Sequence, residues 1–289
     1  MKRSILFVLC CCLLACVTST AWADATITRD EDSITIEGVL TGSEATELNK
    51  EVAAANPEEL TFVLEDADNA TLAAICEKYP GMVELQLERS DALTSLAPLS
   101  KLKKITTLKI FSDNLSDFTP LQTLTSLKLL NLTCSTMGPN LKWMAGMTKL
   151  ESITIDAGEA LVSLEGIPLL PALEKINILT VSIKDLTPLT ALSGLKTLSL
   201  QVCVLHDLSP LAQLSKLREV SFYQSTLKDP STLAKLTQVE KFSLNKTDIK
   251  DLAPLKTLPN LNALNVDKGV FPEGALTGFA NPKIEITER

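Results

Sequence analysis

The stretch DLTPLTALSGLKTLSL, residues 185–200, decides the fold. It opens on Asp, carries a Thr-Pro pair, repeats Leu at every third position and ends on alternating apolar and polar residues. Similar lines begin at Ser95, Asp117, Asn140, Ser163, Asp207, Asp229 and Asp251, so that successive starts are 22 or 23 residues apart. Eight copies with Leu, Ile, Val or Phe at the same positions indicate a repeat array, since a fixed period of about 20–50 residues is typical of stacked repeat proteins.

Each copy is predicted to contain a short strand and a tight turn. The segment from Leu195 to Leu200 alternates apolar and polar residues, which predicts a strand with one buried face. In the next copy Leu211, Leu214 and Leu217 recur at every third position, which favours a 3-10 helix over a long α-helix. The Ser or Thr before the Pro is expected to cap this helix through its hydroxyl. Stacked copies would bury the leucines in one aliphatic core beside a parallel sheet.

The line Leu-x-x-Leu-x-x-Leu-x-Leu, beside Asp-Leu-x-Pro-Leu and with a period of 22, resembles the internalin-like class of bacterial leucine-rich repeats. The resemblance covers residues 93–266. It implies an α/β right-handed solenoid with a concave parallel β-sheet, a convex side of short 3-10 or helical segments, and partner binding on the sheet. The family usually has Asn at the turn after each strand, whereas here that column reads Asp113, Ser135, Gly158, Val181, Cys203, Ser225, Thr247 and Gly269. Weaker ties between successive turns are therefore expected.

Four segments are predicted along the chain. They are a signal peptide at 1–23, an N-terminal cap with irregular strand–helix repeats at 24–92, the array of about eight repeats at 93–266, and a C-terminal cap at 267–289. In the caps, strands are expected at 34–36, 60–64, 85–87 and 283–287, and helices at 69–79 and along an apolar face from Ala45 to Ala55.

The first segment has the features of a secretory leader. An apolar run at 5–17 follows two basic residues, and Ala21-Trp22-Ala23 offers a cleavage site before Asp24. The run is too short for a spanning helix, which needs about 20 residues, so no membrane insertion is expected after cleavage. A competing interpretation takes residues 13–16 as a lipobox with Cys16 lipidated. Both imply export, either to a secreted or periplasmic location or as an outer-membrane lipoprotein.

Charge and cysteine content exclude several classes of function. The chain has 27 basic and 35 acidic residues and a net charge of −8. An acidic chain without a basic run is a poor binder of nucleic acid. Outside the leader only Cys76, Cys134 and Cys203 remain, an odd and widely spaced set that is no disulfide framework. With His206 as the single histidine and no Cys-x-x-Cys pair, no metal site and no cofactor are expected.

No catalytic constellation is recognisable, and a non-enzymatic function is expected. His206 precedes Asp207, but no activated serine can be assigned beside this pair, so a surface corner is the better interpretation. Cys76 is expected in the core and Cys203 at a turn edge. Cys134 is expected on the concave sheet, without a neighbour that would lower its pKa. A hidden enzyme site would have to lie in residues 24–92, the least repetitive region.

The side of the sheet that faces away from the core is the predicted binding surface. Its central column is polar and short-chained: Gln86, Lys109, Asn131, Thr154, Asn177, Ser199, Ser221, Ser243 and Asn265. The next column is Glu88, Phe111, Thr133, Asp156, Leu179, Gln201, Tyr223, Asn245 and Asp267. Large apolar groups on a solvent-facing sheet favour a binding hot spot, although single exposed apolar residues are ordinary. The predicted partner-binding residues are Phe111, Asn131, Asn177, Leu179, Gln201, Tyr223 and Lys241.

Together these observations predict an exported, monomeric leucine-rich-repeat protein that binds a protein partner of unknown identity, in a host-interaction or envelope role. A preformed curved sheet loses little entropy on binding. Two alternatives stay open. One is a glycan or peptidoglycan ligand held by the Asn, Ser, Thr and Gln side chains, and the other is a structural envelope lipoprotein.

Overall fold

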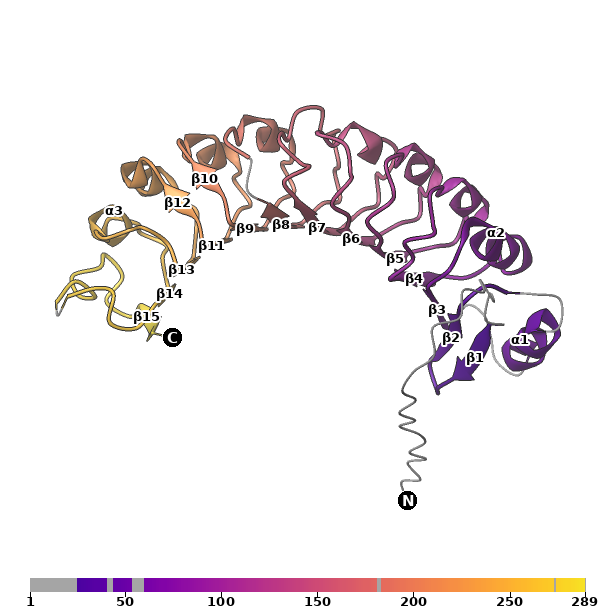
Figure 1. The fold of residues 1–289 in the computed structure, drawn as a ribbon. Coiled ribbons are helices and arrows are strands. Elements are labelled where there is room, and N and C mark those ends of the chain that lie inside the picture. The colour runs from indigo at the N-terminus through magenta and orange to yellow at the C-terminus, as the bar shows by residue number, and fades with distance from the viewer. Residues whose placement is uncertain (1–24, 41–43, 54–59, 181–182, 273, 289) are drawn as a thin grey trace, which may run out of the picture.

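The computed structural model describes residues 25–40, 44–53, 60–180, 183–272 and 274–288. In these ranges the chain forms an arch with a 13-stranded sheet along its inner, concave side and short helices along its outer side (Figure 1). Cys16, the cleavage site before Asp24, Ala55 and Val181 lie outside the described residues.

The sheet and the helices have the following bounds. The strands of the large sheet are β1 (Thr26–Arg29), β2 (Ser33–Glu37), β3 (Thr61–Glu65), β4 (Glu84–Glu88), β5 (Thr107–Phe111), β6 (Leu129–Thr133), β7 (Ser152–Gly158), β8 (Lys175–Thr180), β9 (Thr197–Gln201), β11 (Glu219–Tyr223), β13 (Lys241–Asn245), β14 (Ala263–Val266) and β15 (Glu285–Glu288). A second, parallel pair is formed by β10 (Val204–Leu205) and β12 (Thr226–Leu227). The helices are α1 (Glu44–Ala53), α2 (Asn69–Lys78) and α3 (Ala253–Lys256), and the 3-10 helices are η1 (Ala97–Lys101), η2 (Thr119–Thr123), η3 (Lys142–Met144), η4 (Thr187–Ala191), η5 (Ser209–Gln213) and η6 (Pro230–Lys235).

Strands that follow one another in the sequence are adjacent in the large sheet, apart from β10 and β12, which pair separately. Each copy contributes one parallel strand to the large sheet. The fixed period places equivalent residues side by side, so that Ser199 is the register partner of Ser221 and Ser221 that of Ser243. The solenoid with a concave parallel sheet and 3-10 convex side is confirmed. The exception is β1, which pairs antiparallel with β2 and was not foreseen from the sequence.

The repeated leucines form one continuous core behind the sheet. Leu211, Leu214 and Leu217 are each at most 1% exposed, and their equivalents in the other copies are buried apart from Ile167, which is partly buried against the core. In the N-terminal cap, Leu48 and Val52 on α1 join this core. Burying such a side chain contributes about 1.5–3 kcal/mol relative to leaving it exposed, so each copy is stabilised mainly by its neighbours.

The first residue of every copy caps the convex turn. In all eight copies its side chain accepts a hydrogen bond from the backbone N–H two residues further on: Ser95, Asp117, Asn140, Ser163, Asp185, Asp207, Asp229 and Asp251. The expected capping by the hydroxyl before the Pro is wrong. At Thr119, for example, the hydroxyl donates to the carboxylate of Asp117 at 2.6 Å, because the carboxylate already occupies the acceptor position.

Small buried side chains replace the missing Asn ladder at the turns after the strands. Ser225 Oγ accepts from the N–H of Cys203 at 3.1 Å, and Ser90 Oγ accepts from the N–H of Ala67 at 3.2 Å. Ser112 Oγ donates to the carbonyl of Ser90 at 2.9 Å. The expectation of weak ties between turns is therefore corrected, because hydroxyls perform the bridging at these positions.

The copy at residues 163–184 departs from the others. β7, the strand of the preceding copy, is longer than its neighbours, and its register with β8 of this copy shifts between Asp156 and Gly158. Within the described residues no helix occurs between η3 and η4. Leu169, at the place that 3-10 helices occupy in other copies, is 69% exposed.

Candidate partner-binding surface

Three rows of side chains on β8, β9, β11 and β13 form the concave patch. The first row is Lys175, Thr197, Glu219 and Lys241, the second is Asn177, Ser199, Ser221 and Ser243, and the third is Leu179, Gln201, Tyr223 and Asn245. Members of a row are register partners on adjacent strands. The residues between the rows, such as Leu198 and Leu200, are buried in the core, because successive side chains of a strand point to opposite faces.

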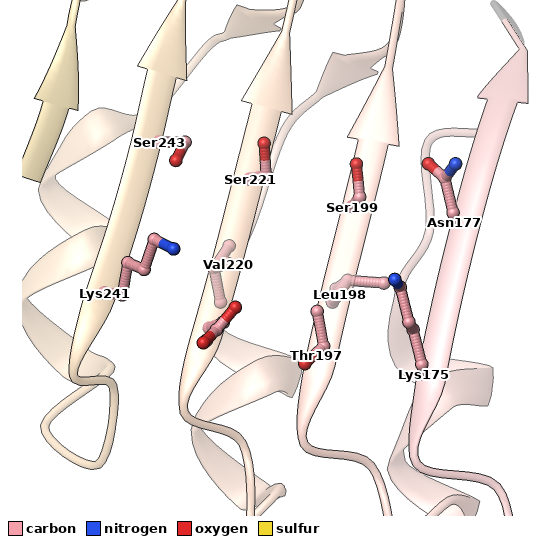
Figure 2. Close-up of a pocket in the computed structure, with 10 residues that line it drawn as sticks. Lys175, Asn177, Thr197, Leu198, Ser199, Val220, Ser221, Lys241 and Ser243 are labelled. Carbon is pink, nitrogen blue, oxygen red and sulfur yellow. The ribbon is translucent and has the colours of Figure 1, made fainter. Parts of the chain in front are cut away.

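The first two rows surround a hollow of about 290 Å³ on the sheet. Figure 2 shows Ser199, Ser221 and Ser243 in line across three strands, with Lys175 and Lys241 at opposite borders. The hollow exists because short hydroxyl side chains stand between longer ones. Its lining is polar apart from Leu198 and Val220 in the floor.

The third row contains an aromatic side chain that is fixed in place. Lys246 Nζ donates to the Tyr223 hydroxyl oxygen at 2.7 Å and lies 5.0 Å from the centre of the Tyr223 ring. This hydrogen bond raises the pKa of Lys246, so the ammonium stays charged. Because Tyr223 accepts from Lys246, its own O–H remains available to an acceptor on a partner.

Five of the seven predicted residues lie together in the concave patch: Asn177, Leu179, Gln201, Tyr223 and Lys241. Two of them are in contact, since Gln201 Nε2 donates to Asn177 Oδ1 at 3.3 Å. The other two, Phe111 on β5 and Asn131 on β6, lie further along the arch. Phe111 is 47% exposed on the same concave side.

Sequence reasoning missed Lys175 and Glu219 in the first row. They are the first residues of β8 and β11, two positions before the column that was taken as central. The same alternation that pointed to Lys241 on β13 extends to them, so the signal was present.

Three cysteines and the single histidine lie within the residues that the structure describes. Cys76 and Cys203 are buried, and burial raises the pKa of each thiol to about 12. The placement of Cys134 on the concave sheet is wrong: it is buried directly after β6, with Sγ donating to the carbonyl of Leu115 at 3.2 Å, because the strand ends one residue earlier. His206 is exposed.

The described part of the chain has neither a metal-binding cluster nor a membrane-spanning helix. No group of three or more His, Cys, Asp or Glu residues is placed to hold a metal ion there. None of its helices has the length and apolar character needed to cross a membrane.

No protein-family model matches the sequence, and no curated protein sequence does. Among solved structures, an internalin, InlF, from Listeria monocytogenes is similar with a TM-score of 0.66 and 22% identity, over 86% of this chain and 74% of that chain. The chain has an internalin-like leucine-rich-repeat fold. At this identity the likeness concerns the fold.

Two further internalin structures from Listeria monocytogenes are similar over shorter stretches. InlC2 matches with a TM-score of 0.42 at 22% identity, over 68% of this chain and 76% of that one. The functional domain of InlJ, which includes a cysteine ladder, matches with a TM-score of 0.46 at 17% identity, over 72% of this chain and 47% of that one.

Proposed function

We propose that this internalin-like chain is a non-catalytic binding protein that holds a protein partner against the concave patch. The observation that carries the proposal is the combination of a fixed aromatic anchor, Tyr223, with a preformed hollow on adjacent strands. Aromatic anchors next to pockets are typical of binding hot spots. Both features stand on paired strands, so little ordering is needed when a partner binds.

Export is part of the proposal and is supported by the leader-like sequence at residues 1–23. Cleavage before Asp24 gives a secreted or periplasmic monomer, whereas lipidation of Cys16 gives an outer-membrane lipoprotein. The division into caps and array at 24–92, 93–266 and 267–289 belongs to the same proposal. Mass spectrometry of the N-terminus of the exported protein distinguishes the two kinds of processing.

Site-specific photocrosslinking tests the binding proposal. A photoreactive amino acid at Asn245, in the third row of the concave patch and outside the lining of the hollow, is compared with one at Gln213, on the convex helix η5. We expect one protein partner to crosslink at Asn245 and not at Gln213. A triple variant with Phe111→Ala, Leu179→Ala and Tyr223→Ala should lose this crosslink, whereas Leu169→Ala, which removes an exposed convex side chain, should keep it.

The other outcomes have defined meanings. Crosslinking at Gln213 alone would show that the partner binds on the convex side. If the residue at Asn245 crosslinks to glycan and to no protein, the ligand is a sugar held by the hydroxyl and amide side chains instead of a protein partner. Equal crosslinking by the triple variant would contradict the role of the aromatic and aliphatic anchors.

A further inference from the structure

Two lysines at the borders of the hollow lack acidic partners. Elsewhere on the concave face, Lys109 lies 3.6 Å from the carboxylate of Glu84 on the adjacent strand. Lys175 and Lys241 form no ion pair with any residue that the structure describes. Figure 2 shows both side chains leaning over the hollow, from opposite sides.

The one carboxylate in the hollow offsets only one of these two ammonium charges. Glu219 is the register partner of Lys241 on the next strand, so the two side chains stand on the same face of the sheet. No ion pair joins the two among the described contacts. With two ammonium groups and one carboxylate, the lining of the hollow has an excess of one positive charge.

The lining of the hollow supplies hydrogen-bond donors. Thr197, Ser199, Ser221 and Ser243 each present a hydroxyl. Ser243 Oγ accepts from Asn265 Nδ2 at 2.9 Å, which leaves its own O–H to donate. Hydroxyl and ammonium donors together suit a negatively charged oxygen acceptor, because hydrogen bonds to an ionised group are the stronger ones.

The geometry points to a single carboxylate-bearing side chain of the protein partner, an Asp or Glu, seated in the hollow between Lys175 and Lys241. This inference rests on the proposed function and narrows the chemistry of its partner. Glu219 offsets one ammonium and repels a second anionic group, so the hollow fits one carboxylate. The net charge of −8 on the whole chain disfavours a broadly acidic partner, so the acidic residue stands in an otherwise neutral or basic segment.

The third row indicates what accompanies the acidic residue. Leu179 and Tyr223 stand two positions beyond Asn177 and Ser221 of the second row along their strands, a distance of about 7 Å. A partner segment that places its carboxylate in the hollow therefore meets these side chains with a neighbouring residue. Contact with a ring and an aliphatic chain favours an apolar residue there.

Peptide selection on the purified protein tests the inference. Random 12-residue peptides displayed on phage are selected on wild-type protein, and binding is then measured with K175Q/K241Q. The control K216Q/K228Q removes the same charge from two exposed lysines outside the hollow. We expect the selected peptides to share one Asp or Glu next to an apolar residue. Their affinity should fall at least tenfold with K175Q/K241Q or on changing that Glu to Gln, and should stay within twofold for the control.

Two further measurements make the test decisive. Peptide Glu→Gln and protein Lys175→Gln should be non-additive in a double-mutant cycle, since they remove the same contact. A Ser221→Trp variant, checked for its circular dichroism, fills the hollow and should abolish binding. Two outcomes would contradict the carboxylate inference while supporting the concave binding surface. In one, the selected peptides lack an acidic residue; in the other, they bind K175Q/K241Q normally but lose binding to Ser221→Trp. Selected peptides that bind the Ser221→Trp variant as tightly as the wild type would contradict both proposals.

Discussion

The regular copies at residues 185–266 and the irregular copy at 163–184 contribute equally to the sheet but differ on the convex side. The regular copies have a 3-10 helix or a short α-helix there, whereas the described part of the irregular copy has none. Its strand β8 nevertheless keeps five consecutive register partners on β9. Its inward residues Ile176 and Ile178 are buried like their equivalents Leu198 and Leu200. The comparison teaches that inward aliphatic residues set the strand register, and that the convex helix is dispensable for the concave patch.

The largest expected effect separates a buried and an exposed convex leucine in the two regions. Leu211→Ala, in the regular η5, removes a side chain that is 0% exposed and should lower the free energy of unfolding by about 2–5 kcal/mol. Leu169→Ala, in the irregular copy, removes one that is 69% exposed and should change it by less than about 0.5 kcal/mol. Urea unfolding followed by circular dichroism measures both. Similar losses would mean that Leu169 is covered in solution.

The turn after η3, in the copy at residues 140–162 that precedes the irregular one, should depend on backbone shape. Gly146 follows η3 with φ of 92°, and an added Cβ would lie 2.8 Å from the carbonyl oxygen of Gln122. Gly146→Ala combines this clash with a left-handed backbone that alone costs about 1–2 kcal/mol, so we expect a loss of about 2 kcal/mol or more in urea unfolding.

Gly158 offers a matched control in the β7 irregularity. Its φ is 54°, and an added Cβ would meet nothing within 4 Å. Gly158→Ala should cost only the conformational part, about 1 kcal/mol. If the two substitutions cost the same, close approach to Gln122 does not constrain this turn.

The capping residues predict a difference in pH dependence between the two regions. Hydrogen bonds from the hydroxyl and N–H of Thr187 hold the pKa of Asp185 below its ordinary value. The stabilisation is therefore present above the ordinary pKa of about 3.9 and is lost as the pH falls through the lowered pKa of the folded chain. Asp185→Ala should cost about 1 kcal/mol at pH 7, and less at pH 2–3.

Two variants isolate the charge from the hydrogen bond. Asp185→Asn keeps an acceptor and should retain most of the stability at pH 7 while reducing its loss in acid. Ser163, the equivalent cap of the irregular copy, accepts from Glu165 N at 2.9 Å through a hydroxyl that does not titrate. Ser163→Ala should lower stability by a similar amount at every pH. A pH-dependent loss there would contradict this assignment.

Most of the fold could be predicted from the sequence because the same pattern of apolar and polar residues recurs in every copy. The period of 22 or 23 residues fixed the register, and alternation in segments such as 195–200 fixed the buried face. The hairpin strand β1 could not be predicted, since it has no counterpart in the repeat. The capping side chain was misassigned because Asp117 and Thr119 both have capping oxygens, and only their relative positions show which one accepts.

The candidate site could be predicted in part. Residues that point outward follow from the alternation of each strand, which is why Asn177, Leu179, Gln201, Tyr223 and Lys241 fall on adjacent strands. The hollow itself depends on which neighbouring side chains are short, and the lack of pairing at Lys175 depends on side-chain directions. Neither the hollow nor the lack of pairing can be predicted from the sequence of a single strand.

The smallest expected effect concerns the turn after β9, where the regular copies also differ among themselves. Val202 has φ of 58°, whereas unbranched Gln224 and Lys246 hold the equivalent left-handed positions in the next copies. A β-branched residue is strained in this conformation, and Val202 is 41% exposed, so little burial offsets the strain. Val202→Asn should raise the free energy of unfolding by about 0.5–1 kcal/mol in urea, and Gln224→Asn by less. Val202 directly follows Gln201 of the concave patch. Lower partner crosslinking at Asn245 together with higher stability would therefore show that the strained side chain serves binding. A fall in stability would instead show that its contacts outweigh its backbone cost.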